Sequence, residues 1–184
     1  MKQGSTSLYF IALIPPSPIR EGIARIKEYV ADKFHSGAAL RSPPHITFQP
    51  PFHWEVNRQN ILGEALGVFL KGNAHFETKL SGFGAFSPRV IFINVENNSP
   101  MEALHSSLRD YCHQELGIDN QGKTPFRPHL TIAFRDLTKP QFRLAWEEFE
   151  NRDLHYQFKA VGLSLLKHNG KSWDVLQELP FSNG

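Results

Sequence analysis

The sequence contains one short pattern twice, in which a histidine precedes a threonine by two positions. The first copy is His45 with Thr47, the second is His129 with Thr131, and a proline precedes each histidine. Residues two positions apart on a β-strand point to the same face. Each copy would therefore display an imidazole beside a hydroxyl and turn the apolar residue between them toward a core.

Two imidazoles and two hydroxyls around one small volume suit a phosphoryl centre. Histidine titrates near neutral pH, so one imidazole can be neutral while its partner is protonated. The neutral ring serves as a general base for water, and the cationic ring protonates the leaving oxygen. Threonine hydroxyls can donate to the non-bridging oxygens, where charge builds in the transition state. The sequence leaves open which histidine is the base.

A single copy of this pattern carries little weight, because a lone histidine in a strand is more often structural. Two copies at matching places in a repeated series of elements favour a shared function. The remaining histidines have no such paired spacing, and surface or structural roles are predicted for His35, His53, His75, His105, His113, His155 and His168.

The pattern of apolar residues, Pro and Gly predicts strand–helix–strand–helix–strand twice, followed by a closing hairpin. The predicted strands are 8–14, 45–49, 76–86, 90–95, 129–134, 156–167 and 173–179, and the predicted helices are 18–35, 57–70, 99–116 and 139–150. In the second helix, Ile61, Ala65, Val68 and Phe69 form the predicted inward face.

This order predicts an α+β fold, in which a duplicated unit forms two lobes related by a pseudo-two-fold axis. Two antiparallel sheets would face a central cleft, with the helices packed outside. We expect one domain over residues 1–184, with lobe-forming halves at approximately 7–86 and 89–180.

Composition bounds the compartment and the partners. The 184 residues are 40% hydrophobic and 21% charged, and the formal net charge is +2. This balance permits an anionic partner but lacks the strong basic footprint of a dedicated duplex binder. The lone Cys112 excludes a disulfide within the chain. The apolar run at 8–14 is too short for a membrane span. We expect a cytoplasmic monomer that does not enter membranes.

Metal-ligand spacing is missing from the sequence. It contains no HxH, no HExxH and no DxDxD-type loop, so neither a catalytic metal nor a cofactor is expected. A metal-dependent hydrolase stays open as a competing hypothesis, which chelation would test.

The two motifs and their surroundings resemble the two-histidine (2H) phosphoesterase superfamily, most closely its 2′-5′ RNA ligase / RNA 2′,3′-cyclic phosphodiesterase branch. The resemblance lies in the segments SLYFIALIPP, SPPHITF, GFGAFSPRVIFINVE and FRPHLTIAF. It implies a bilobal fold without a cofactor. It also implies hydrolysis of 2′,3′-cyclic phosphates on RNA ends or small nucleotides, or the reverse 2′-5′ ligation. His45 and His129 would be the acid/base pair, and Thr47 and Thr131 the phosphate ligands.

One position departs from this resemblance. Some relatives place an arginine five residues after the second motif histidine, where this chain has Phe134. Arg135 would substitute if the strand bulges. Otherwise the cleft is less basic than that of an RNA-end enzyme, which favours nucleotides or short ends as partners.

Several further residues are candidates for substrate contacts. Arg127 and Lys123 in the loop before the second motif could meet phosphates, Phe126 could line the cleft, Arg89 could reach it, and Tyr9 could stack on a base, whereas Phe48 is predicted to be core. The main alternative function is a non-catalytic module of the same fold that binds RNA ends or nucleotides.

Overall fold

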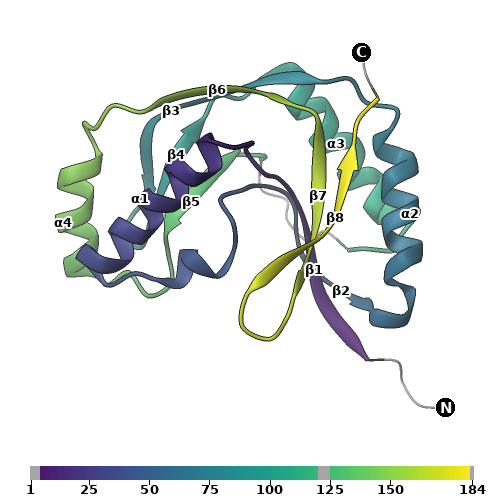
Figure 1. Ribbon diagram of the computed structural model, residues 1–184, viewed down its shortest axis with the longest axis horizontal. Helices are drawn as coiled ribbons and strands as arrows, with labels where there is room; N and C mark the ends of the chain where they lie inside the picture. The colour runs from purple at the N-terminus through teal and green to yellow at the C-terminus, as the bar shows by residue number, and fades with distance from the viewer. Residues whose placement is uncertain (1–4, 120–124, 183–184) are drawn as a thin grey trace.

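The structure is a computed structural model that describes residues 5–119 and 125–182 (Figure 1). The described residues form eight strands, four α-helices and two short 3-10 helices. In chain order they are β1 (Thr6–Leu13), α1 (Ile19–Phe34), η1 (Ala38–Arg41), β2 (Ile46–Glu55), η2 (Val56–Arg58), α2 (Gln59–Leu70), β3 (Phe76–Phe86), β4 (Val90–Val95), α3 (Ser99–Gln114), β5 (His129–Ala133), α4 (Lys139–Phe149), β6 (His155–Ala160), β7 (Gly162–His168) and β8 (Trp173–Pro180).

The strands form two four-stranded antiparallel sheets. The first has the order β2-β1-β7-β8, and the second has the order β5-β4-β3-β6. The motif strands β2 and β5 are the edge strands of their sheets, and they lie next to each other where the sheets meet. The predicted α+β fold class is therefore confirmed, and the meeting of two edges brings the two motifs together.

The helices cover the two sheets in pairs. In the second sheet, α1 packs against β5 and α4 against β4; in the first, α3 packs against β2 and α2 against β7 and β8. Figure 1 shows α1 and α4 at one end of the molecule and α2 and α3 at the other. None of the helices in the described ranges is long and apolar enough to cross a membrane.

The sheets do not follow the predicted halves 7–86 and 89–180. Strand β3 of the first half lies in the second sheet, and β7 and β8 of the second half lie in the first sheet. The reason is that β3 and β4 follow each other closely in the chain. They pair as an antiparallel hairpin across a short turn, and this pairing holds β3 in the second sheet. Each sheet is thus built from both halves of the chain.

The predicted strand 156–167 is two strands in different sheets. The chain leaves the second sheet at Val161, whose side chain is exposed, and enters the first sheet at Gly162. A Cβ on Gly162 would lie 2.5 Å from the carbonyl oxygen of Leu179, so a residue without a side chain is needed at this crossing. Both strands carry apolar residues, and the sequence pattern alone does not reveal the change of sheet.

The first motif strand is longer than predicted. The sequence predicts an end at Pro50-Pro51, but β2 continues to Glu55. The pairing of β2 with β1 slips between Tyr9 and Ile11, opposite these prolines. An edge strand tolerates proline at such a bulge, because one side of it needs no ladder hydrogen bond.

Strand parity turns the motif side chains away from the core, as predicted. Ile46, Phe48, Leu130 and Ile132 are buried, which leaves the histidines and threonines on the opposite faces. The predicted inward face of α2 is wrong at Ile61 and Val68, which are exposed. Ala65 and Phe69 are partly buried, and the fully buried leucines are Leu62, Leu66 and Leu70.

Candidate active site

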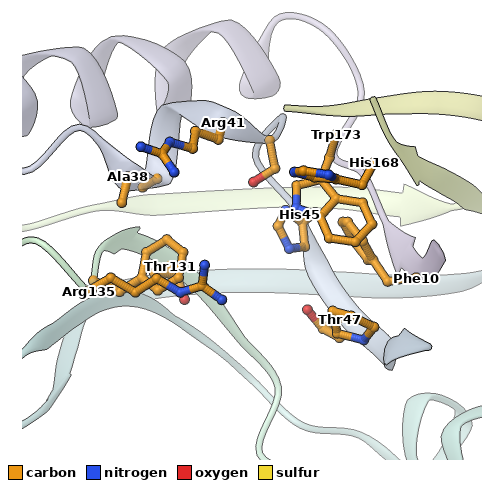
Figure 2. A pocket seen from close by; sticks show the side chains of 13 residues that line it. Phe10, Ala38, Arg41, His45, Thr47, Thr131, Arg135, His168 and Trp173 are labelled. Carbon is orange, nitrogen blue, oxygen red and sulfur yellow. The ribbon is translucent and has the colours of Figure 1, made fainter. Parts of the chain in front are cut away.

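Two hollows meet at the first motif strand. One, of about 270 Å³, is lined by His45, Thr47 and Thr131 together with residues outside the motifs (Figure 2). The other, of about 550 Å³, is lined by His129 and again by Thr47. Thr47 therefore borders both hollows, one beside His45 and Thr131 and the other beside His129, and the two hollows together are called the cleft below.

Both histidines are oriented by the same local hydrogen bond. The Nδ1 of His45 lies 2.8 Å from the carbonyl oxygen of Pro43, and the Nδ1 of His129 lies 2.7 Å from that of Arg127. A carbonyl oxygen can only accept, so Nδ1 carries the proton in each ring and Nε2 is left for chemistry. The intervening Pro44 and Pro128 restrict the backbone and favour this hydrogen bond from each imidazole to the carbonyl oxygen two residues earlier.

The His45 ring is half-buried and packs 4.8 Å from the ring of Phe10, measured between centroids. The pKa of His45 is lowered to about 4, mainly by burial and to a smaller extent by the charges of Lys27 and His129, against the raising effect of the Pro43 hydrogen bond. His45 is therefore neutral at pH 7. The effect of His129 also means that the two imidazoles are close enough to interact through space.

Lys27 holds the backbone segment that precedes the first motif. Its side chain on α1 is buried, and Nζ donates to the carbonyl oxygen of Ser42 at 2.7 Å. Burial lowers the pKa of Lys27 to about 8, so it is mostly protonated at pH 7. It thus anchors the segment that leads to His45 and brings a positive charge near the cleft.

The His129 ring packs against two phenylalanine rings that also contact each other. Its centroid is 5.2 Å from that of Phe86 and 5.1 Å from that of Phe92. Phe92 reaches this place because Gly84 on the neighbouring strand has no side chain, since a Cβ there would lie 2.5 Å from the Phe92 ring. Gly84 therefore permits the packing that holds the second histidine.

Arg135 lines the first hollow, beside Phe134. Strand β5 ends at Ala133, and Arg135 has a left-handed backbone with φ of 63°. The pairing of β5 with β4 also shifts between Thr131 and Ala133, so the strand does bulge, and the left-handed turn at Arg135 follows this bulge. The guanidinium carbon lies 5.1 Å from the centroid of the Phe134 ring, so the arginine makes a cation–π contact with its neighbour in the chain.

The other sequence candidates divide between the cleft and the rest of the fold. Phe126 and Arg127 line the second hollow, and the Phe126 ring stacks on His105 with centroids 3.9 Å apart. Tyr9 is buried and donates to Gln59, so its predicted role in base stacking is wrong. Arg89 is exposed and lines neither hollow. Lys123 lies outside the described residues.

Four larger residues of the first hollow are not singled out by the sequence. They are the aromatic and basic residues Phe10, Arg41, His168 and Trp173, and the small residues Ala38, Ala39, Ser42 and Pro51 complete the lining that the sequence does not single out. The sequence predicts a surface or structural role for His168, yet its ring and that of Trp173 stand side by side at the cleft. The four aromatic and basic residues come from β1, η1 and the β7–β8 hairpin, so no spacing in the sequence connects them with the motifs.

Across residues 5–119 and 125–182, no three His, Cys, Asp or Glu side chains group closely enough to hold a metal ion. Cys112 is buried, and burial raises the pKa of its thiol to about 12.

The chain belongs to the 2′-5′ RNA ligase superfamily, whose family model matches residues 15–172. It is 27% identical to a protein of Geobacillus kaustophilus that is named as an inferred phosphoesterase, over 92% of this chain and 93% of that one. It is also 26% identical to the RNA 2′,3′-cyclic phosphodiesterase of Thermotoga maritima, over 95% and 96% of the two chains.

Solved structures share the fold. TT0787 of Thermus thermophilus superposes with a TM-score of 0.66 at 20% identity, covering 94% of this chain and 97% of that one. LigT of E. coli, crystallised with 3′-AMP, superposes with a TM-score of 0.68 at 17% identity, covering 96% and 99%. The two sheets and the four helices are thus the architecture of LigT structures.

Proposed function

We propose that this protein is a metal-independent phosphoesterase that hydrolyses 2′,3′-cyclic phosphodiesters of RNA ends or nucleotides. His45 and His129 act as the general acid/base pair, and Thr47 and Thr131 bind the non-bridging phosphate oxygens. The observations that support this most are that Thr47 borders both the hollow beside His45 and the hollow beside His129, and that a backbone carbonyl oxygen holds Nδ1 of each ring and leaves Nε2 for chemistry.

The reaction uses this arrangement as an in-line displacement. One imidazole takes a proton from water through Nε2 while the water oxygen attacks phosphorus. The P–O bond to one ribose oxygen breaks, and the other imidazole, protonated, donates to that oxygen. The threonine hydroxyls donate to the two non-bridging oxygens as charge develops on them. The histidines end with exchanged protonation states, which solvent resets.

The same groups can catalyse ligation. If the 5′-hydroxyl of a second RNA replaces water, its attack on the cyclic phosphate breaks the bond to the 3′-oxygen and leaves a 2′-5′ linkage. The names of the relatives are compatible with this breadth, because the family is that of 2′-5′ RNA ligases and one relative is a cyclic phosphodiesterase.

Turnover of a nucleoside 2′,3′-cyclic phosphate by EDTA-treated protein tests the proposal, with the product phosphate position read by ³¹P NMR. H45N and H129N should each lower kcat by roughly 10²- to 10⁴-fold, the usual contribution of a positioned acid or base. H113N is the matched control, since His113 is exposed near the end of α3 and pairs with Asp119.

Three outcomes would contradict the proposal. Full activity in both motif variants would remove the acid/base roles. Activity that disappears with EDTA and returns with a divalent ion would favour a metal-dependent hydrolase. Tight binding of the cyclic nucleotide without product would favour the non-catalytic binding module.

A further inference from the structure

A cluster of three rings adjoins the second hollow. The ring of His105 on α3 stacks on that of Phe126, with centroids 3.9 Å apart and an interplanar angle of 11°. Phe126 also packs against the buried Phe48 of β2 at 5.6 Å, and Phe48 lies 6.4 Å from His105. These separations are those of interacting aromatic pairs. Phe126 is therefore held by rings of α3 and of the first motif strand, while it lines the cleft itself.

Phe126 lies in a segment that regular structure does not hold. Residues 125–128 belong to neither a helix nor a strand. Pro125 and Pro128 have no backbone N–H, so half of the segment cannot donate a backbone hydrogen bond. Side-chain packing therefore has a large part in fixing this segment, and the stack on His105 is the tightest ring contact that Phe126 makes.

The same segment orients the second motif histidine. Arg127, next to Phe126 in the chain, supplies the carbonyl oxygen that lies 2.7 Å from Nδ1 of His129. That hydrogen bond decides which ring nitrogen carries the proton and which is presented to the cleft. The position of the Phe126 ring is thus one peptide away from the acceptor that holds His129.

The two motifs are anchored at the same place. Lys27 of α1 donates to the carbonyl oxygen of Ser42, three residues before the first motif histidine. His105 of α3 stacks on Phe126, three residues before the second. Each of these helices precedes the motif strand of its half of the chain. The first motif therefore has a hydrogen-bonded anchor and the second an aromatic one.

His105 has the surroundings of a neutral stacking ring. It is half-buried, and burial lowers its pKa, as does the charge of Arg109, against the raising effect of Asp110. A neutral imidazole can lie flat on a phenyl ring without the cost of removing a charge from water. This environment fits a ring whose task is contact rather than proton transfer.

We infer that His105 is a positioning residue for catalysis, which acts on His129 through Phe126 and the carbonyl oxygen of Arg127. The stack keeps residues 125–128 where this oxygen accepts from Nδ1. Without the stack the carbonyl moves away from the ring, and the proton is no longer confined to Nδ1, so Nε2 loses its fixed role. This inference rests on the proposed function, in which His129 belongs to the acid/base pair.

The experiment compares the native protein with H105A and H105F in turnover of a nucleoside 2′,3′-cyclic phosphate and in ¹⁵N NMR of the imidazoles. H105A should lower kcat roughly tenfold and change KM less than about twofold, because a small misplacement of a catalytic group is costly. At alkaline pH, where imidazole is neutral, the Nδ1–H tautomer of His129 should dominate in the native protein and lose population in H105A. H105F keeps a planar ring and should restore both properties.

Y111A is the matched control. Tyr111 lies on the same helix and makes a comparable stack with Phe69 of α2, at 4.4 Å and 19°, and neither ring lines the cleft. It should keep native kcat and the native His129 tautomer. Native kcat and tautomer in H105A, or an equal loss of kcat in Y111A, would overturn the positioning role. If the native protein turned over no substrate, the proposed function would fail, whereas the tautomer would still decide whether His105 holds the second motif.

Discussion

The two motif strands orient their histidines by the same hydrogen bond but place them in different surroundings. In β2 and β5 alike, the imidazole Nδ1 donates to the carbonyl oxygen two residues earlier. His45 then packs against Phe10 near the charge of the buried Lys27, whereas His129 packs against Phe86 and Phe92 beside the larger hollow. The local sequence orients each ring, and the tertiary neighbours determine the surroundings of each ring and, for His45, its lowered pKa.

The threonines offer the sharpest way to separate the two motifs. Thr47 lines both hollows, and Thr131 lines only the first. Loss of a donor to a developing oxyanion costs on the order of 10²- to 10³-fold in kcat. T47V should therefore lose about this much and T131V about tenfold, in steady-state assays with a cyclic nucleotide.

T78V is the matched control for these variants. Thr78 is buried, and within residues 5–119 and 125–182 its hydroxyl has no hydrogen-bond partner. Its replacement by the isosteric valine should leave both kcat and the free energy of unfolding nearly unchanged. Equal losses in T47V and T131V would mean that the two motifs contribute alike.

The burial of His45 predicts a dependence of stability on pH. Its folded pKa of about 4 lies below the unfolded value of about 6.5, so between these values the unfolded state binds more protons. The free energy of unfolding should fall as the pH drops from about 6.5 to about 4, and the loss is absent above this window. Allowing for the solvent-facing part of the ring, we expect about 2 kcal/mol.

Urea unfolding of the native protein and of H45Q at pH 7 and pH 4.5 measures this effect. H45Q should be less sensitive to acid, because glutamine does not titrate. H113Q, which alters an exposed histidine, should follow the native protein. An unchanged acid sensitivity in H45Q would contradict the desolvated state of His45.

Removal of the Lys27 charge should change the titration of His45. In K27M the pKa of His45 should rise, by less than it would if burial were relieved, because the Lys27 charge lowers it less than burial does. The carbonyl oxygen of Ser42 loses its donor, so we also expect a loss of about 1–3 kcal/mol in stability.

NMR titration of the His45 ring protons measures the pKa, and chemical unfolding measures the stability. K33M is the comparison on the same helix, since Lys33 is exposed and pairs with Glu148. If the His45 midpoint stayed in place in K27M, Lys27 would be an anchor without an electrostatic role.

Among the test variants, the smallest effect on kcat is expected for a substitution at Gly84, which lies on the side of the second motif. In G84A the new Cβ would press on the Phe92 ring, which packs against His129. We expect a few-fold lower kcat and a stability loss of about 1–3 kcal/mol, as for other overpacked sites. G72A is the control, because a Cβ there has 3.6 Å to its nearest neighbour. Native kcat in G84A would show that the ring can shift without moving His129.

The sequence was most informative where structure depends on neighbours along the chain. The alternation of side chains along a strand correctly predicted that Ile46, Phe48, Leu130 and Ile132 are buried and that the motif histidines and threonines lie on the opposite faces. The bounds of β3 and β4 were also predicted correctly. Two copies of one motif also pointed to a shared cleft. These features follow from backbone geometry and from the period of apolar residues, which a sequence contains in full.

Tertiary structure decided everything that depends on which strands pair. The break at Val161 sends β7 and β8 into the first sheet and delivers Trp173 and His168 to the cleft, although they lie far from both motifs in the chain. The turn at Arg135 and the burial of Lys27 likewise arise from packing between distant elements. Contacts between distant elements leave no repeating pattern of residues in the sequence. The sequence therefore determined the two histidine–threonine pairs, and the fold determined their electrostatic and aromatic surroundings.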